Sequence, residues 1–311
     1  MELLRLVRPL SLQRFSFEDT ACVLSHLLPG HNFTPNDHRQ FYRETEGNPF
    51  FITEIARNME AKGCPSDITP NIRNALGQRL TLLPTDARRI LNLMSIFFDG
   101  ASFRLLTEMS NKDEHELIEI LESLISHNLI RESASGSSIV FQFTHRKIQE
   151  YIYGEMSWTQ KRILHNRAGL CYEGTLKGTK IDFPLYSKLL YHYERGDNQE
   201  KYMVYAVKNT YLYLNVAHEF FPFVDHDTPV GIHGALLNDL NAVEPFLRSI
   251  EEKVTGYLQD YLSAATAPEQ LQLASDFYHM MGRYHILKCN YPKGLDYIFQ
   301  LKELNREART P

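Results

Sequence analysis

Hydrophobic positions recur at helical spacing along nearly the whole chain. Ser16, with Asp19 three residues later, forms the sequence pattern of a capping box and predicts a helix that runs to about Leu28. Thr34-Pro35 and Thr69-Pro70 repeat a second start signal, in which a hydroxyl side chain caps the helix and proline takes its first position. The chain is therefore predicted to begin with short, well-capped helices.

A break and restart is predicted at Gly47-Asn48-Pro49. The helix that starts at Pro35 should end near Glu46, with Gly47 free to adopt a positive φ. Asn48 is a favoured N-cap, and Pro49 fits the first position of the next helix because its missing N–H has no partner there. Helix capping alone explains these three residue types, so a purely structural role for the motif is one of two interpretations.

Residues 83–157 combine predicted helices with the only strand pair that the sequence predicts. Amphipathic helices are predicted over 86–98, 103–109 and 112–127, followed by strands over 129–132 and 138–143 around a turn-rich tip at 134–137. The apolar face expected for the third helix comprises Leu117, Ile118, Leu121, Leu124 and Ile125. Three helices followed by a β-hairpin predict a winged-helix domain.

Residues 158–311 return to helix and are rich in tyrosine. In the last predicted hairpin the first helix carries Gly282, the bend is Asn290-Tyr291-Pro292, and the second helix carries Gly294. A small residue on each helix is typical of a tetratricopeptide repeat, although His285 stands where that pattern prefers an aromatic. An earlier hairpin is expected from residues 186–196 and 202–220. The predicted fold is mainly α, with domains at 1–82, 83–157 and 158–311.

Several segments together resemble the STAND-type signalling ATPases, a family that includes LuxR-type activators. The segments are Arg8-Pro9-Leu10-Ser11, Thr45-Glu46-Gly47-Asn48-Pro49-Phe50-Phe51, Leu83-Pro84-Thr85-Asp86-Ala87-Arg88-Arg89 and Phe143-Thr144-His145. The resemblance implies a helical lid of a nucleotide-binding module, a winged helix and tetratricopeptide-like repeats, which form the carboxy-terminal part of such a protein. Full-length relatives bind and hydrolyse ATP.

The resemblance also implies two nucleotide contacts. Gly47, Asn48 and Pro49 match the lid element whose proline packs near the adenine ring. His145 matches a winged-helix histidine that contacts the β-phosphate of ADP in distant relatives. Thr144 and Arg146 replace the methionine and aspartate that flank that histidine, so His145 can also be read as a simple helix-start residue.

No GxxxxGK[ST] motif occurs, so the sequence offers no backbone loop to cradle phosphates and no lysine to neutralise them. We therefore expect no ATPase activity, assign no catalytic residue, and expect no cofactor in this chain by itself. The expected partner is a P-loop domain, in cis if the chain is a fragment and in trans otherwise. Besides a fragment, a truncated reading frame or one partner of a split two-protein system would explain the missing P-loop.

Charge argues against nucleic acid and anionic membranes as partners. The chain has 33 basic and 38 acidic residues, for a net charge of −5. The third helix of the predicted winged helix, 112–127, carries five acidic side chains against one lysine, and DNA phosphates would repel it. Four cysteines without a CxxC pair and no signal-peptide pattern indicate a cytoplasmic protein.

A metal site is not expected. His218, Asp225, His226, Asp227 and His233 supply ligand types, but no helix-locked pair such as HExxH is present. His165 and His192 are interpreted as isolated.

The predicted function is regulatory and scaffolding: the lid and winged helix relay the nucleotide state of a P-loop core to repeats that bind a protein or small-molecule inducer. Two alternatives stay open. One is a stand-alone protein–protein interaction module, and the other is part of a transcriptional regulator whose DNA reader lies outside this chain.

Overall fold

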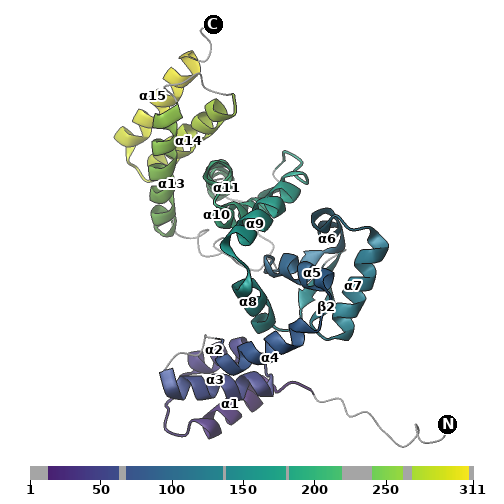
Figure 1. The fold of residues 1–311 in the computed structure, drawn as a ribbon. Coiled ribbons are helices and arrows are strands. Elements are labelled where there is room, and N and C mark those ends of the chain that lie inside the picture. Colours follow the sequence, from purple (N-terminus) through teal and green to yellow (C-terminus); the bar gives the residue numbers. More distant parts are fainter. Residues whose placement is uncertain are drawn as a thin grey trace, which may run out of the picture. The chain divides into compact units, whose positions relative to one another are not determined.

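The structure is a computed structural model, and it describes residues 13–62, 68–135, 138–179, 182–218, 240–261 and 268–307. Most of these residues are helical, with one small sheet (Figure 1). The chain divides into two compact units, residues 1–158 and 159–311. Among the described residues no helix is long and apolar enough to cross a membrane.

Unit 1 begins with four helices whose ends follow the predicted capping signals. The helices are α1 (Phe17–Leu27), α2 (Pro35–Thr45), α3 (Pro49–Lys62) and α4 (Pro70–Thr81). Ser16 and Asp19 form the complete capping box, and Thr34 does the same with Asp37. Thr69 accepts from the N–H of Ile72 at the start of α4. Local hydrogen bonds therefore set where these helices begin, and buried apolar side chains hold them together: Leu24, Phe41, Ile52, Ile55, Ile72 and Leu76.

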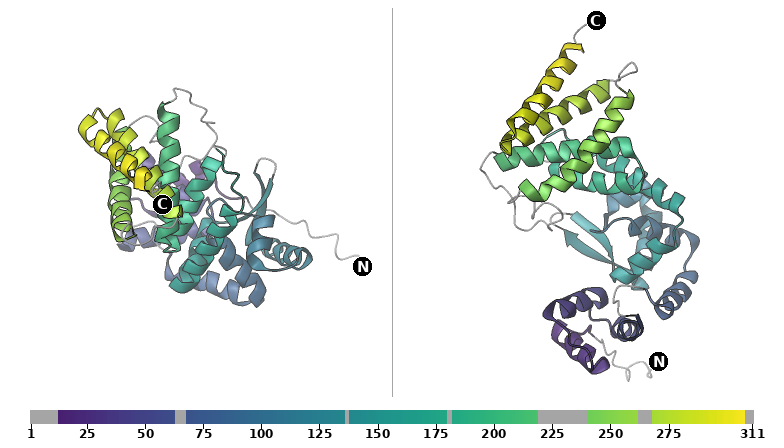
Figure 2. Two further views of the ribbon diagram at one scale, coloured as in Figure 1. Left: turned by 90° about the horizontal axis from the view of Figure 1, so that it is seen from above. Right: turned by 90° about the vertical axis from the view of Figure 1, so that its left-hand side faces the viewer.

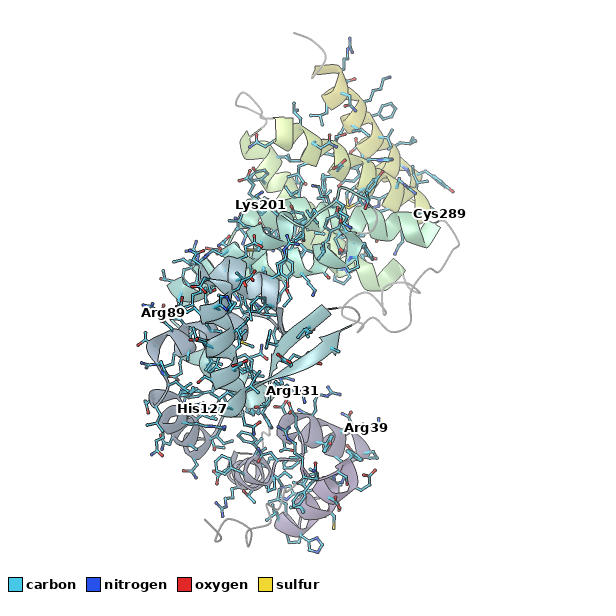
Figure 3. The ribbon with its side chains drawn as sticks, turned by 90° about the vertical axis from the view of Figure 1, so that its right-hand side faces the viewer. Arg39, Arg89, His127, Arg131, Lys201 and Cys289 are labelled. Carbon is cyan, nitrogen blue, oxygen red and sulfur yellow. The ribbon has the colours of Figure 1, made fainter. Side chains whose placement is uncertain are left out.

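The rest of unit 1 combines helices with an antiparallel sheet. Its elements are α5 (Thr85–Ser95), β1 (Ala101–Ser102), α6 (Phe103–Ser110), α7 (Glu114–Ser126), β2 (Ile130–Ser135), β3 (Ser138–Phe143) and α8 (Arg146–Glu155). Figure 3 marks this region by Arg89 on α5, His127 just after α7 and Arg131 on β2. The strand order is β1-β3-β2.

Three details of this region differ from the sequence-based expectation. Strand β1 was not predicted, because two residues are too few to show alternation; it pairs Ala101 with Phe141. Strand β2 reaches Ser135, which pairs with Ser138, so the turn is narrower than residues 134–137. Ile118 is exposed, because it points about 100° away from Leu117 and only the narrower face of α7 is covered.

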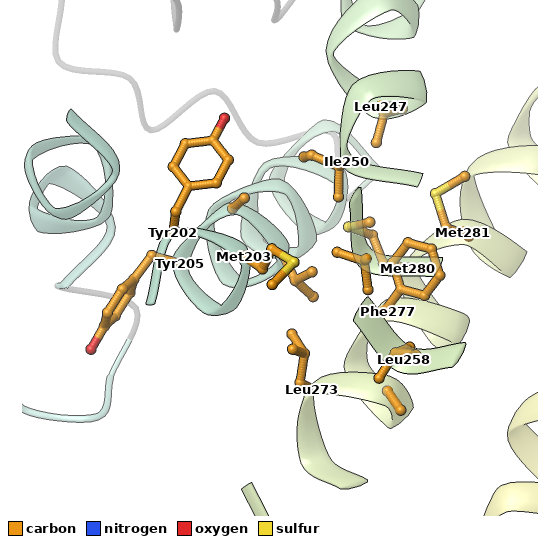
Figure 4. Close-up of a cluster of buried hydrophobic side chains, with 14 of the residues drawn as sticks. Tyr202, Met203, Tyr205, Leu247, Ile250, Leu258, Leu273, Phe277, Met280 and Met281 are labelled. Atoms are coloured by element: carbon orange, nitrogen blue, oxygen red, sulfur yellow. The ribbon is translucent and has the colours of Figure 1, made fainter. Parts of the chain in front are cut away.

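Unit 2 is helical throughout its described residues. It contains α9 (Trp158–Glu173), α10 (Phe183–Arg195), α11 (Gln199–His218), α13 (Leu240–Tyr261), α14 (Pro268–Leu287) and α15 (Tyr291–Glu307). The two predicted hairpins are present as α10–α11 and α14–α15. Side chains of α11, α13 and α14 share one hydrophobic core, which includes Tyr202, Met203, Tyr205, Leu247, Ile250, Leu258, Leu273, Phe277, Met280 and Met281 (Figure 4).

Small residues let α14 and α15 approach closely where they lie side by side (Figure 2). A Cβ on Gly282 would meet Ile298 at 2.8 Å, and one on Gly294 would meet Ile286 at 2.8 Å and the Gly282 carbonyl oxygen at 3.1 Å. The ring of His285 stacks parallel on Tyr297, with centroids 5.7 Å apart. Histidine thus supplies the flat ring for which the repeat pattern prefers an aromatic residue.

Gly294→Ala is expected to lower the free energy of unfolding by about 1–3 kcal/mol, because the added methyl meets backbone as well as side chain and forces the helices apart. Gly256→Ala in α13 is the matched control. Its Cβ would meet nothing within 4 Å, so it should be neutral or stabilise by about 0.5–1 kcal/mol. Urea unfolding of both variants checks this, and equal effects would contradict the close helix contact.

Candidate functional site

The turn between α2 and α3 adopts the predicted break and restart. Glu46 and Gly47 both have positive φ, 47° and 68°. The Asn48 side-chain oxygen accepts from the N–H of Phe50 at 3.0 Å, and Pro49 opens α3. A Cβ on Gly47 would lie 2.1 Å from the carbonyl oxygen of Phe15, so only glycine fits here. The residue types of this motif are explained by the turn alone.

His145 joins this turn to the start of α8. Its Nδ1 accepts from the N–H of Lys147 at 3.0 Å and caps the helix. The other ring nitrogen, Nε2, therefore carries the proton and donates to the carbonyl oxygen of Thr45 at 2.8 Å. The ring also rests on Phe51, with centroids 4.1 Å apart. Burial lowers the pKa of His145, so the ring is neutral at physiological pH.

Charged groups reinforce the same contact. The Lys147 ammonium is fully buried and pairs with the carboxylates of Glu44 and Glu150. Arg14 donates to the Glu46 carboxylate at 2.7 Å and to the carbonyl oxygen of Thr144 at 2.7 Å. These contacts fix the turn against the loop that precedes α8.

The other oxygen of the Glu46 carboxylate accepts from the backbone N–H of Arg146 at 3.2 Å. We call the whole set the His145 junction, and it comprises Arg14, Glu44, Thr45, Glu46, Phe51, Thr144, His145, Arg146 and Lys147. Residues 44–46 and residues 144–147, about 100 positions apart in the sequence, are thus joined by several hydrogen bonds and an ion pair.

The junction presents one edge of the turn outward. Phe51 is 4% exposed and packs inward, whereas its neighbour Phe50 is 42% exposed. Pro49 is also exposed, and Gly47 is buried. The structure therefore places the four residues predicted to contact nucleotide near one another. Both ring nitrogens of His145 are engaged within the protein, and a phosphate would have to displace the Thr45 carbonyl to reach Nε2.

Sequence reasoning did not find Arg14, Glu44 or Lys147. Each is a single charged residue in a helix or loop, with no spacing that marks it as special. Their importance comes from pairing across about 100 positions in the chain, and this is visible only in the folded protein.

Two of the histidines considered as metal ligands lie next to each other in the structure. His165 and His192 are not isolated, because their Nδ1 atoms lie 2.9 Å apart in a hydrogen bond. Across the described ranges, no three histidine, cysteine or carboxylate side chains are grouped as metal ligands. Asp225, His226, Asp227 and His233, and the segment Arg8–Ser11, lie outside the described residues, as does the His218 side chain.

Comparison with known proteins gives little further guidance. No family model matches the chain, and no curated protein matches it. One solved structure found by fold comparison is the crystal structure of a Signal Transduction ATPase with Numerous Domains (STAND) protein with a tetratricopeptide repeat sensor from Pyrococcus horikoshii. The match has 14% identity and a TM-score of 0.32, and covers 96% of this chain and 55% of that one. This chain thus spans about half of that protein, at a TM-score too low to assign a shared fold.

Proposed function

We propose that this chain is the regulatory and scaffolding part of a STAND-type signal-transduction ATPase. Residues 1–82 would act as the helical lid, 83–157 as a winged helix, and 158–311 as a helical-repeat sensor. The supporting observation is the His145 junction. The family resemblance associates Gly47–Pro49 and His145 with nucleotide, and His145 donates a hydrogen bond to the carbonyl oxygen of Thr45, two residues before Gly47.

The order of elements supports the winged-helix assignment. Helix α5 is followed by β1, α6, α7 and the β2–β3 hairpin, with β3 in the centre of the sheet. Glu114, Glu116, Glu119 and Glu122 on α7 are all exposed. A helix with this charge would be repelled from the major groove. We therefore propose that the winged helix packs on protein and does not bind DNA.

The junction could relay a change in the lid to the rest of the chain. A core that closes on the exposed Pro49 and Phe50 would pull on the turn that also holds His145 through Thr45. His145 caps α8, and α8 runs to Glu155, three residues before α9 starts. A packed junction of this kind responds by switching between arrangements more readily than by gradual deformation.

The nucleotide would be bound mainly by the P-loop core, with ATP or ADP as the cofactor of the assembled protein. This chain contributes no phosphate cradle, so we propose that it does not hydrolyse ATP by itself. The repeats would bind a protein or small-molecule inducer in the cytoplasm. The runner-up function is a stand-alone interaction module, and it is favoured by the engagement of both ring nitrogens of His145.

Phe50 offers the first test of this proposal. An exposed aromatic beside Pro49 suits an interface, so the chain should self-associate alone and bind a P-loop domain encoded by the same or a neighbouring reading frame. Phe50→Ser should reduce both associations, with at least a tenfold weaker affinity for the P-loop domain by calorimetry.

Phe98→Ser is the matched control, because Phe98 is also an exposed phenylalanine of unit 1 but lies outside the lid. It should leave the affinity for the P-loop domain unchanged. A chain that is monomeric at high concentration and ignores the P-loop domain would favour the stand-alone module.

A further inference from the structure

The short segment that leads into α1 is pinned against the turn between α2 and α3. The backbone N–H of Phe15 donates to the carbonyl oxygen of Gly47 at 2.9 Å. In the other direction, the Cβ position of Gly47 lies only 2.1 Å from the carbonyl oxygen of Phe15, so the two backbones are in direct contact. A displacement of residues 14–15 would therefore act directly on this turn.

Arg14 extends this contact to the start of α8. One guanidinium nitrogen donates to the Glu46 carboxylate at 2.7 Å, and another donates to the carbonyl oxygen of Thr144 at 2.7 Å. The guanidinium group is planar and rigid, so it holds these two acceptors at a fixed separation. A single side chain thus links three segments of unit 1, namely residues 14–15, the α2–α3 turn and the residue that precedes His145.

The ion pair between Arg14 and Glu46 forms the outer layer of the His145 junction. Its two side chains are 44% and 35% exposed, whereas His145 and Lys147 are buried. An exposed ion pair contributes little to stability, and breaking a buried pair such as that of Lys147 costs far more. Arg14 is therefore not what holds unit 1 folded, and its effect lies in where it places its two partners.

Glu46 passes the position of Arg14 on to the start of α8. Its backbone is left-handed, with a φ of 47°, and residues other than glycine keep this conformation where surrounding contacts hold it. One carboxylate oxygen accepts from Arg14, and the other accepts from the backbone N–H of Arg146 at 3.2 Å. The carbonyl oxygen of the preceding Thr45 accepts from His145. Loss of Arg14 should therefore loosen both hydrogen bonds that join the turn to α8.

We infer that Arg14 is a positioning residue, which ties the path of the chain into α1 to both sides of the His145 junction. This segment is then a second input to the relay, besides the exposed edge at Pro49 and Phe50. A P-loop core attached in cis would act on residues 14–15 directly, whereas a core bound in trans would act through the exposed edge alone. The inference rests on the proposed function for its signal, but the coupling itself needs no nucleotide.

Amide hydrogen exchange of the full chain, without partner or nucleotide, measures this coupling. In Arg14→Gln the amides of Asn48, Arg146 and Lys147 should exchange at least ~3-fold faster, while amides of unit 2 and the melting temperature stay unchanged. Arg14→Lys keeps the charge but has one nitrogen in place of the fork, so it should not restore the protection. Arg39→Gln, at an exposed arginine of α2 (Figure 3), is the matched control and should exchange like wild type.

The imidazole of His145 gives a second readout, which responds to the charge of Arg14. Burial lowers the pKa of this ring most, the hydrogen bond to Thr45 and the charge of Glu46 raise it, and the charges of Arg14 and Lys147 lower it further. The pKa of His145, measured by NMR titration, should therefore rise in Arg14→Gln. The rise should be smaller in Arg14→Lys, because the positive charge is kept.

The inference is overturned if Asn48 and Arg146 exchange in Arg14→Gln as they do in wild type, because Arg14 is then only a surface ion pair. It is also overturned if Arg14→Gln melts as early as Lys147→Ala, since Arg14 would then hold the fold itself. With the P-loop domain bound, a nucleotide-dependent change in protection that Arg14→Gln abolishes would support it. If wild type shows no such change, the proposed relay fails, and the exchange of the chain alone still decides whether Arg14 couples the segments.

Discussion

Lys147→Ala is expected to lower the free energy of unfolding of unit 1 by about 3–5 kcal/mol. The ammonium of Lys147 is fully buried between Glu44 and Glu150, and Glu44 is buried as well. Removing the lysine leaves the Glu44 carboxylate away from water without its cation, and this costs far more than the loss of a surface ion pair. Chemical unfolding followed by circular dichroism measures the effect.

Two control variants test whether the loss of stability in Lys147→Ala comes from the buried charge. Arg89→Ala removes one partner of the exposed pair with Asp86 and should cost less than about 1 kcal/mol. Lys147→Met combined with Glu44→Leu replaces both charges with apolar groups and should recover most of the loss. If the Lys147 and Arg89 single variants unfold alike, Lys147 is not buried as the structure has it.

Unit 2 is expected to lose stability in mild acid because of the buried pair His165 and His192. Burial lowers the pKa of His165 to about 4, helped by the positive charges of Arg195 and Lys161. Burial, together with His165 and the positive charge of Lys188, lowers the pKa of His192 to about 3. In the unfolded chain both would titrate near 6.5.

The direction of the pH effect follows from these values. Above pH 6.5 both rings are neutral in either state, and the full stability is present. As the pH falls below 6.5 the unfolded chain takes up protons that the folded protein excludes, so stability is lost progressively down to the folded pKa values. At pH 5 the loss is about 2 kcal/mol for each histidine relative to pH 8.

Thermal melts of wild type and His192→Gln at pH 8, 6.5 and 5 check this expectation. Glutamine can still hydrogen-bond to His165 but does not titrate, so its melting temperature should fall less between pH 8 and pH 5. Carboxylates contribute little to the difference, because they titrate mostly below this range. An identical acid dependence in both proteins would mean that His192 is not a buried neutral ring.

The sequence alone predicted the features that depend on neighbouring residues. The capping box at Ser16, the turn at Gly47-Asn48-Pro49 and the start at Thr69-Pro70 are all confirmed, because each satisfies its own backbone groups within four residues. The glycines of α14 and α15 were also expected to lie where these helices cross, and they do.

Features that depend on distant pairing could not be predicted. Nothing in the residues around His145 indicates that its Nε2 donates to Thr45, and nothing around Lys147 indicates its partner Glu44. The two-residue strand β1 exists only because β3 offers it an edge. His165 was interpreted as isolated because its partner, His192, lies on another helix.

The most direct test of the relay follows amide hydrogen exchange across the His145 junction. The full chain is mixed with the P-loop domain encoded by the same or a neighbouring reading frame, once with ADP and once with a non-hydrolysable ATP analogue. The amides of Asn48, Arg146 and Lys147 report on the junction, because they donate to Thr45, Glu46 and His145. The account predicts that protection of residues 45–51 and 145–148 changes together between the two nucleotides. Equal protection of both segments in ADP and in the ATP analogue, with the P-loop domain bound, would contradict it.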